Sequence, residues 1–218
     1  MDKNQTGIKL MEEGNWEEAA KMFTEAIEET PTDAIPYINF GNLLSAVGNK
    51  EKALDFYDKA IELDEGAAAA YYCKGNVFYE LENFTEAQQM FEKAYRCGLE
   101  TGDNFFMLGM SLVHLNELRL ALPYLQRSSE LNEDDAEVSF QYGLCLAQEN
   151  YIDEAIKQLQ RAVSIDPNHA DALYNLGVAY GFKEEANMAL EMFNRALEVQ
   201  PDHLLAGHGK KLIEDSGL

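Results

Sequence analysis

The sequence predicts an all-α protein built from a repeated pair of helices, and three observations support this fold class. Glycine recurs every 34 residues, at Gly7, Gly41, Gly75, Gly109, Gly143 and Gly177. Alanine recurs with the same period, and a bulky residue follows each alanine by four positions, as in Ala19 and Phe23. Each cycle also contains two stretches of apolar residues with helical spacing, separated by a short break. A period kept over six cycles indicates a repeat protein.

The second cycle shows how each helix pair is built. Residues 34–47 form one amphipathic pattern, Gly48 and Asn49 supply the turn, and residues 50–63 form the second pattern. Such a short connection makes the two helices antiparallel. Helices must stop where cycles one, five and six carry proline, at Pro31, Pro167 and Pro201. Pro123 lies near the start of its helix, so we expect it to bend that helix slightly without interrupting it.

The recurring glycine needs a physical reason, because glycine inside a helix costs about 1 kcal/mol relative to alanine. We expect the glycine of each first helix to meet the alanine of the second helix where the two axes cross most closely. A Cβ atom on both sides would push these axes apart. Each large side chain buried by close packing contributes roughly 1.5–3 kcal/mol, which outweighs the cost of the glycine.

These columns of residues resemble the tetratricopeptide repeat family. The family pattern has glycine at position 8, alanine at 20, an aromatic residue or leucine at 24 and alanine at 27, and only Ser128 departs from it. The resemblance implies a right-handed α-solenoid of six repeats in one domain. The repeats would span 1–33, 34–67, 68–101, 102–135, 136–169 and 170–203. Residues 204–218 lack the small-residue columns and carry charged pairs, which favours a polar capping helix.

Composition excludes several classes of function. The net charge of −22 opposes binding to phosphate backbones and to anionic membrane surfaces. No apolar run approaches the ~20 residues needed to span a bilayer, and residues 1–10 have no apolar signal segment. The three cysteines, Cys73, Cys97 and Cys145, are widely spaced and odd in number, which favours reduced thiols and a cytoplasmic location.

Motifs for chemistry are absent from the sequence. No glycine-rich nucleotide loop, zinc-protease motif or nucleophile elbow occurs. Among the four histidines, His169 and His203 occupy the same repeat position and are too far apart to share a metal ion. We expect these histidines at the surface. We therefore expect no catalysis, no cofactor and no bound metal.

The resemblance implies that the first helices line a concave groove through positions 2, 5, 6, 9, 12 and 13 of each repeat, which we term the groove positions. The candidate partner-binding residues at these positions are Ile38, Asn39, Asn42, Tyr72, Asn76, Tyr79, Phe106, Met110, Val113, Phe140, Leu144, Tyr174 and Asn175. Position 5 is apolar or aromatic in repeats two to six. We interpret it as an exposed ladder that marks a binding surface; the alternative is packing against the next first helix.

The groove positions divide into two sections. Asparagines in repeats two and three suit the backbone of an extended peptide, because an amide both donates and accepts hydrogen bonds. Repeats four and five are apolar and suit a hydrophobic side chain or an amphipathic helix. The groove positions of repeats two to six contain no lysine or arginine, and their acids are Glu80, Asp103, Glu137 and Asp171. We expect a neutral-to-basic partner segment with apolar anchors.

Some family members hold acidic chaperone tails in a basic carboxylate clamp. Here the corresponding positions carry Ile38, Ala69, Cys73 and Asp103, so this clamp is absent. The leading hypothesis is a non-catalytic adaptor that binds a peptide or helix of a partner protein, similar to the small all-repeat scaffold proteins of bacteria. Two alternatives stay open: a self-assembling structural element, and a dedicated chaperone for a single apolar client.

Overall fold

The computed structural model describes residues 2–216, and within this range it contains thirteen α-helices and no strands. The predicted all-α class is therefore confirmed. The helices are α1 Lys3–Glu12, α2 Trp16–Glu29, α3 Ala34–Ala46, α4 Lys50–Leu63, α5 Ala68–Glu80, α6 Phe84–Arg96, α7 Gly102–His114, α8 Leu118–Leu131, α9 Ala136–Gln148, α10 Ile152–Ile165, α11 Ala170–Phe182, α12 Ala186–Val199 and α13 Leu204–Ser216. From α3 on, every odd-numbered helix begins at the first residue of a predicted repeat or cap.

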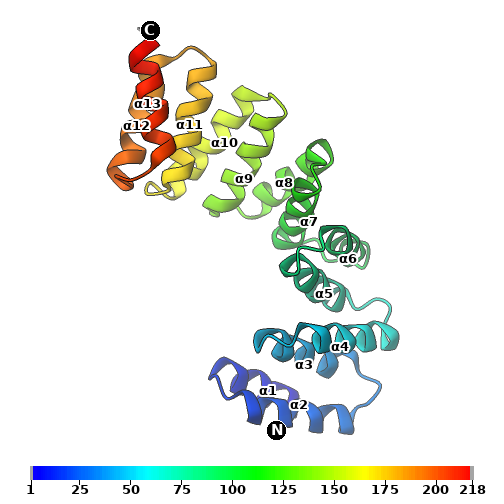
Figure 1. Ribbon diagram of the computed structural model, residues 1–218. Coiled ribbons are helices and arrows are strands. Elements are labelled where there is room, and N and C mark those ends of the chain that lie inside the picture. The colour runs from blue at the N-terminus through cyan, green and yellow to red at the C-terminus, as the bar shows by residue number, and fades with distance from the viewer. Residues whose placement is uncertain (1, 217–218) are drawn as a thin grey trace. The chain divides into compact units, whose positions relative to one another are not determined.

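The chain divides into two compact units, which we describe separately. Unit 1 is Met1–Leu115 and unit 2 is Asn116–Leu218 (Figure 1). The division falls between α7 and α8, the two helices of the predicted fourth repeat. The organisation of all six repeats into one domain stays a prediction.

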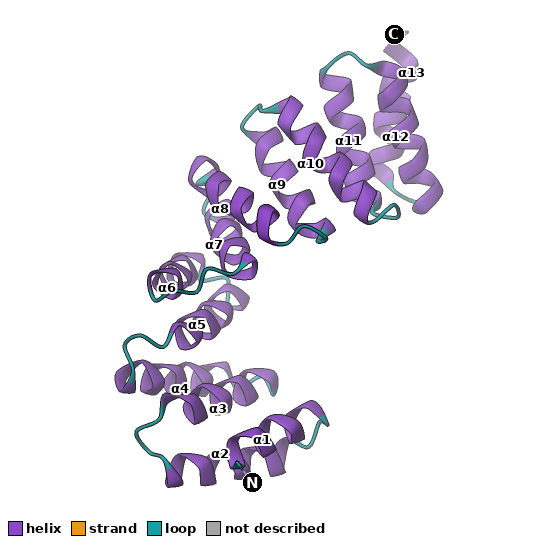
Figure 2. Cartoon of the chain, turned by 180° about the vertical axis from the view of Figure 1, so that it is seen from behind, coloured by secondary structure: helices purple, strands orange, loops and turns teal. Residues whose placement is uncertain are grey.

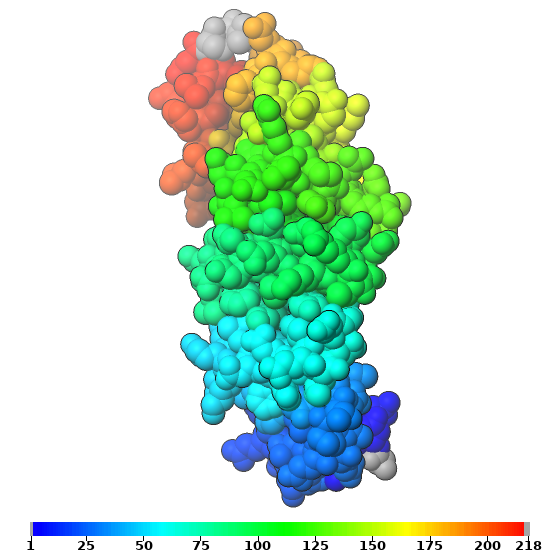
Figure 3. Space-filling view, turned by 90° about the vertical axis from the view of Figure 1, so that its right-hand side faces the viewer, coloured from blue at the N-terminus to red at the C-terminus, as the bar shows by residue number. Residues whose placement is uncertain are grey.

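Helix pairs form the packing unit on both sides of this division. In unit 1, α1 packs on α2, α3 on α4 and α5 on α6, and α1, α3 and α5 each also contact the first helix of the next repeat. In unit 2, α9 pairs with α10 and α11 with α12, and α13 packs against both α11 and α12 (Figure 2). On the face seen in Figure 3, the atoms of residues 3–96, coloured from blue to green-cyan, form a continuous surface.

The turn within each pair places one residue in the left-handed region of the backbone. These residues recur every 34 positions, with φ between 59° and 82°: Gly14, Gly48, Glu82, Asn116, Asn150 and Glu184. The following amide closes the turn; for example, the Asn83 N–H donates to the Phe78 carbonyl at 2.9 Å. This geometry ends a helix and reverses the chain, as predicted for Gly48, although four of the six residues are not glycine.

The helix-interior glycines pack against the bulky residue at position 24 of the same repeat. A Cβ atom on Gly75 would lie 2.7 Å from Cε1 of Phe91, the bulky residue at position 24 of the same repeat. The ring at position 24 is also the first contact of Gly7, Gly41 and Gly177. The ring at position 24 is therefore the nearest neighbour of these glycines. The expected close approach to alanine at position 20 stays a prediction.

Helix α8 runs without a break from Leu118 to Leu131 and contains Pro123. The prediction that this proline does not interrupt its helix is confirmed. None of the helices described between residues 2 and 216 combines the length and apolar content needed to cross a bilayer.

Candidate functional site

Position 5 of the repeats is more buried than the sequence indicated. Ile38 is 8% exposed and Phe140 is 7% exposed, so the prediction of an exposed ladder is wrong at these two residues. The other three members, Tyr72, Phe106 and Tyr174, are half-buried. These side chains therefore contribute to packing, which was the alternative interpretation.

Contacts with neighbouring rings explain this burial. The Phe140 ring lies 4.5 Å from the His169 ring, between centroids, and the Tyr72 ring lies 5.7 Å from that of Phe91. Ile38 belongs to a buried cluster with Tyr57 and Val77. The side chains of Tyr72 and Phe140 thus reach the second helix of their own repeat and the residue that caps the next first helix, respectively.

Unit 1 contains a small polar pocket that brings two predicted residues together. Asn42 and Asn76, at position 9 of successive repeats, both line this cavity of about 240 Å³. The hydroxyl of Tyr57 donates to Oδ1 of Asn42 at 2.8 Å. The remaining lining residues are Ser45, Ala46, Cys73 and Glu80. These four residues also occupy groove positions, whereas Tyr57 lies on a second helix and carries no sequence signal for the groove.

Two other predicted residues of unit 1 are engaged by neighbouring side chains. The amide of Asn39 donates to Oδ1 of Asn4 at 2.9 Å, which links the first two repeats. The Tyr79 hydroxyl lies 2.9 Å from Nε2 of His114, whose ring stacks on Phe84 at 4.2 Å. Tyr79 thus belongs to an aromatic cluster that joins α5, α6 and α7. Burial raises the pKa of its hydroxyl.

The predicted apolar section is divided between the units. Phe106, Met110 and Val113 lie half-buried on α7 in unit 1, whereas Phe140 and Leu144 lie on α9 in unit 2. Their joint action as one binding section stays a prediction.

Unit 2 contains an apolar pocket formed by α11, α12 and α13. Its volume is about 370 Å³, and its lining residues are Tyr174, Val178, Gly181, Phe182, Phe193, Leu205, His208, Gly209, Leu212 and Ile213. Tyr174 was the only one predicted. Asn175 does not line the pocket, and its amide donates to the Asp171 carbonyl one turn earlier, at 2.8 Å. The missed residues carried a signal, since Leu205 and Leu212 lie 34 residues after Asp171 and Val178.

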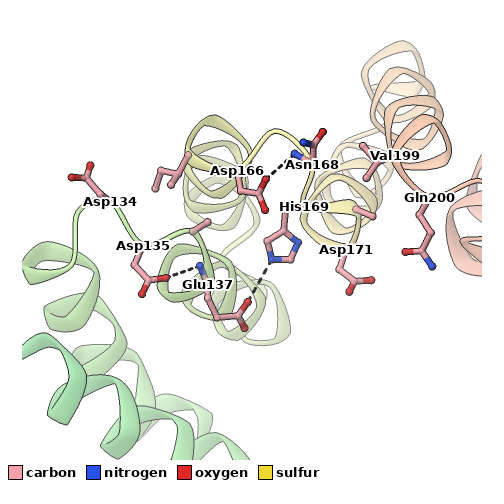
Figure 4. Close-up of a pocket in the computed structure, with 12 residues that line it drawn as sticks. Asp134, Asp135, Glu137, Asp166, Asn168, His169, Asp171, Val199 and Gln200 are labelled. Carbon is pink, nitrogen blue, oxygen red and sulfur yellow. Dashed lines mark hydrogen bonds and ion pairs between the residues drawn. The ribbon is translucent and has the colours of Figure 1, made fainter. Parts of the chain in front are cut away.

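A second pocket in unit 2 is polar, with a volume of about 770 Å³ (Figure 4). It is lined by Asp134, Asp135, Ala136, Glu137, Ile165, Asp166, Asn168, His169, Ala170, Asp171, Val199 and Gln200. Nδ1 of His169 accepts from the Ala172 N–H at 3.2 Å, and its Nε2 lies 3.5 Å from Oε2 of Glu137. His169 therefore joins α11 to α9. Within residues 2–216, no three His, Cys, Asp or Glu side chains are placed to hold a metal ion.

His203 repeats this arrangement in the next repeat. Its Nδ1 accepts from the Ala206 N–H at 3.2 Å, so its Nε2 carries a hydrogen and donates to Oδ1 of Asp171 at 3.1 Å. The ring also lies 5.2 Å from that of Tyr174. His203 is buried, so its expected surface position was wrong. A histidine at the start of a first helix both caps that helix and bonds to the preceding first helix.

The thiol of Cys73 provides a chemical reporter for the polar pocket. Burial raises the pKa of Cys73 and of Cys145 to about 11. Because only the thiolate reacts, we expect slow alkylation of both by iodoacetamide at pH 8, with rates rising about tenfold per pH unit until pH 11. Peptide mass mapping after timed quenching measures each rate. A rate that is flat between pH 8 and pH 10 would contradict the expectation, and Cys73→Ala confirms the assignment.

Models of the tetratricopeptide repeat family match four segments of the chain. The segments are 10–72, 68–96 and 170–203, described as tetratricopeptide repeat, and 143–181, described as TPR repeat. A local match of 37 residues, 68% identical, relates the chain to the TPR repeat-containing protein YrrB of Bacillus subtilis (strain 168), over 17% of this chain and 18% of YrrB.

Solved structures extend this likeness along the chain. The crystal structure of YrrB, described as a TPR protein with an unusual peptide-binding site, is 58% identical, with a TM-score of 0.84 over 88% of this chain and 99% of that one. PilF of Pseudomonas aeruginosa is 20% identical, with a TM-score of 0.81 over 96% of both chains. MamA is 23% identical, with a TM-score of 0.72 over 77% of this chain and 92% of that one. The last two likenesses concern the fold alone.

Proposed function

The chain belongs to the tetratricopeptide repeat family, and we propose that it is a non-catalytic adaptor whose groove positions bind a segment of a partner protein. The observation that carries this proposal is the polar pocket of unit 1, where Asn42 and Asn76 from successive repeats line one cavity. Two amides in the same repeat position can donate to and accept from the backbone of one extended peptide. The peptide-binding site described for YrrB supports the same kind of ligand here.

The charge of the groove positions supports a neutral-to-basic segment as the ligand. Glu80 lines the polar pocket and forms an ion pair with Lys50 at 3.0 Å, and no lysine or arginine lines the pocket itself. A carboxylate-rich peptide would therefore meet a surface of its own sign on a chain with a net charge of −22. We further propose that the adaptor acts in the cytoplasm, where thiols stay reduced; its described cysteines form no disulfide.

Affinity capture from native lysate at moderate salt tests the adaptor function. We expect Asn42→Ala combined with Asn76→Ala to reduce recovery of specific partners at least tenfold, because both amides leave the pocket. Asn187→Ala is the matched control, since Asn187 is an exposed amide on α12 outside the groove positions. Circular dichroism tests whether the double variant stays folded. Loss of the acceptor for the Tyr57 hydroxyl is expected to cost about 1–3 kcal/mol, because Tyr57 is buried.

Two results would contradict the adaptor function. In one, the wild type captures no protein above the background of the bare resin. In the other, the double variant retains the same partners in the same amounts as Asn187→Ala. A synthetic acidic C-terminal peptide is a negative probe in the same assay, and low-micromolar affinity for it would contradict the expected charge preference.

A further inference from the structure

We propose that α13 forms a wall of the binding groove, and that the pocket between α11 and α13 holds the apolar anchor of a partner segment with basic residues beside that anchor. This proposal rests on the proposed adaptor function and specifies the chemistry of its ligand. It assigns the last helix a role in recognition in addition to covering the end of the repeats.

The register of α13 is the first support. It begins 34 residues after α11, so Leu205, His208 and Leu212 occupy groove positions 2, 5 and 9 of an incomplete seventh repeat. The helix is firmly seated: Ala206 is fully buried, and Gly209 allows an approach in which an added Cβ would lie 2.8 Å from Cζ of Phe193. Thus α13 stands where a first helix stands in the other repeats.

The two sides of α13 differ in polarity. Lys211 occupies position 8, which is glycine in the six repeats, and Lys210 lies 3.9 Å from Glu214 in an ion pair. These residues form the side that would face a second helix. In contrast, Leu205 is 57% exposed and Leu212 is 56% exposed. One side of α13 is therefore polar, whereas the side with the groove positions is apolar.

The pocket beside this apolar side has the size and lining of a ligand site. Its volume of about 370 Å³ falls within the range of roughly 300–1,000 Å³ typical of such sites. Phe182 stands at its edge with 75% of its surface exposed. Large apolar side chains gathered in the open usually mark a surface that a partner covers.

The negative charge of the groove positions around this pocket favours a partner segment with basic residues. The groove positions on α9, α11 and α13 contain the acids Glu137, Asp171 and Asp215 and no lysine or arginine. Helical geometry places Lys210 and Lys211 on other sides of α13. A second copy of the chain would bring a further charge of −22 to the same surface, which opposes self-association. A segment with an apolar anchor and flanking cations fits both the pocket and its surroundings.

Three synthetic peptides test this proposal by fluorescence anisotropy. The first has a Leu-Phe-Leu centre with two lysines on each side, the second carries glutamates in place of the lysines, and the third carries serines in place of the centre. We expect the first to bind the wild type in the micromolar range and the other two at least tenfold more weakly. Absence of binding by the first peptide, or equal binding by the second or third, would overturn the proposal.

Matched variants locate the bound peptide. We expect Leu212→Asn to weaken binding of the first peptide at least tenfold and Leu120→Asn to leave it unchanged. Leu120 is an equivalent control, because it is 58% exposed on α8 in the same unit and lies outside the groove positions. Equal affinities for these two variants would overturn the assignment to this pocket. Light scattering tests for a second copy of the chain in this pocket. If the wild type is a dimer and Leu212→Asn is a monomer, a second copy occupies the pocket and the proposed partner segment does not.

The outcomes for the two proposals are separable. Lysate capture that depends on Asn42 and Asn76, without binding of the first peptide, leaves the adaptor function standing and overturns the role of α13. Peptide binding that depends on Leu212, without capture of any protein by the wild type, supports the pocket and contradicts the adaptor function.

Discussion

Alanine in place of Phe91 is expected to lower the free energy of unfolding by about 3–5 kcal/mol. The ring is fully buried between α5 and α6, and it lies 5.7 Å from the ring of Tyr72. Its removal therefore loses burial and leaves a cavity beside Gly75. Urea unfolding followed by circular dichroism, with hydrogen exchange of the α5 and α6 amides, measures the change. A loss below 1 kcal/mol would show that the two helices collapse onto each other.

A second substitution at Gly75 tests the packing directly. In the wild type, Gly75→Ala is expected to destabilise, because the new methyl would lie 2.7 Å from Cε1 of Phe91. In the Phe91→Ala background, the same change is expected to stabilise by about 1 kcal/mol, since the methyl enters the cavity and alanine favours the helix. A double-mutant cycle measures this reversal of sign. If Gly75→Ala changes the free energy of unfolding equally in both backgrounds, residue 75 does not pack against the Phe91 ring.

Substitution of His203 by alanine is expected to loosen α13 from unit 2. The change removes the cap on the Ala206 N–H and the bond to Asp171, which together contribute about 2 kcal/mol. Amides of α13 should therefore exchange roughly 30-fold faster. Hydrogen exchange followed by mass spectrometry measures this effect at the level of single helices.

Two further variants separate the roles of this histidine. His203→Asn keeps a side-chain acceptor for the cap but does not reach Asp171, so its effect on exchange should be intermediate. His169→Ala makes the same change one repeat earlier and should affect α11 more than α13. Unchanged exchange of α13 in His203→Ala would contradict the anchoring role.

Much of the fold follows from the sequence because the small and bulky residues recur in strict register. The register fixed where the first helices begin, as at Ala34 and Ala170. The register did not show that the ring of Phe91 would be the nearest neighbour of Gly75. A column of residues gives spacing along the chain, whereas the contact depends on how far each ring reaches across the helix pair.

The candidate site was predicted less completely. Asn42 and Asn76 line one pocket as their common position indicated. Phe140 was misjudged because its exposure depends on His169, which belongs to the next helix start. The pocket at α13 was missed because Leu205 and Leu212 lie in a helix without the small-residue columns, although it keeps the groove register.

Lys211 has a consequence for how the gene for such a protein can lengthen or shorten. A lysine at the glycine position disfavours close packing of a second helix against α13. Duplication or loss of a helix pair ahead of Leu204 would leave this helix and its pocket intact. Tyr174, Val178 and Phe193 line the pocket together with residues of α13. Helices α11, α12 and α13 would therefore have to be kept together during evolution, whereas the number of repeats before residue 170 could change without loss of the pocket.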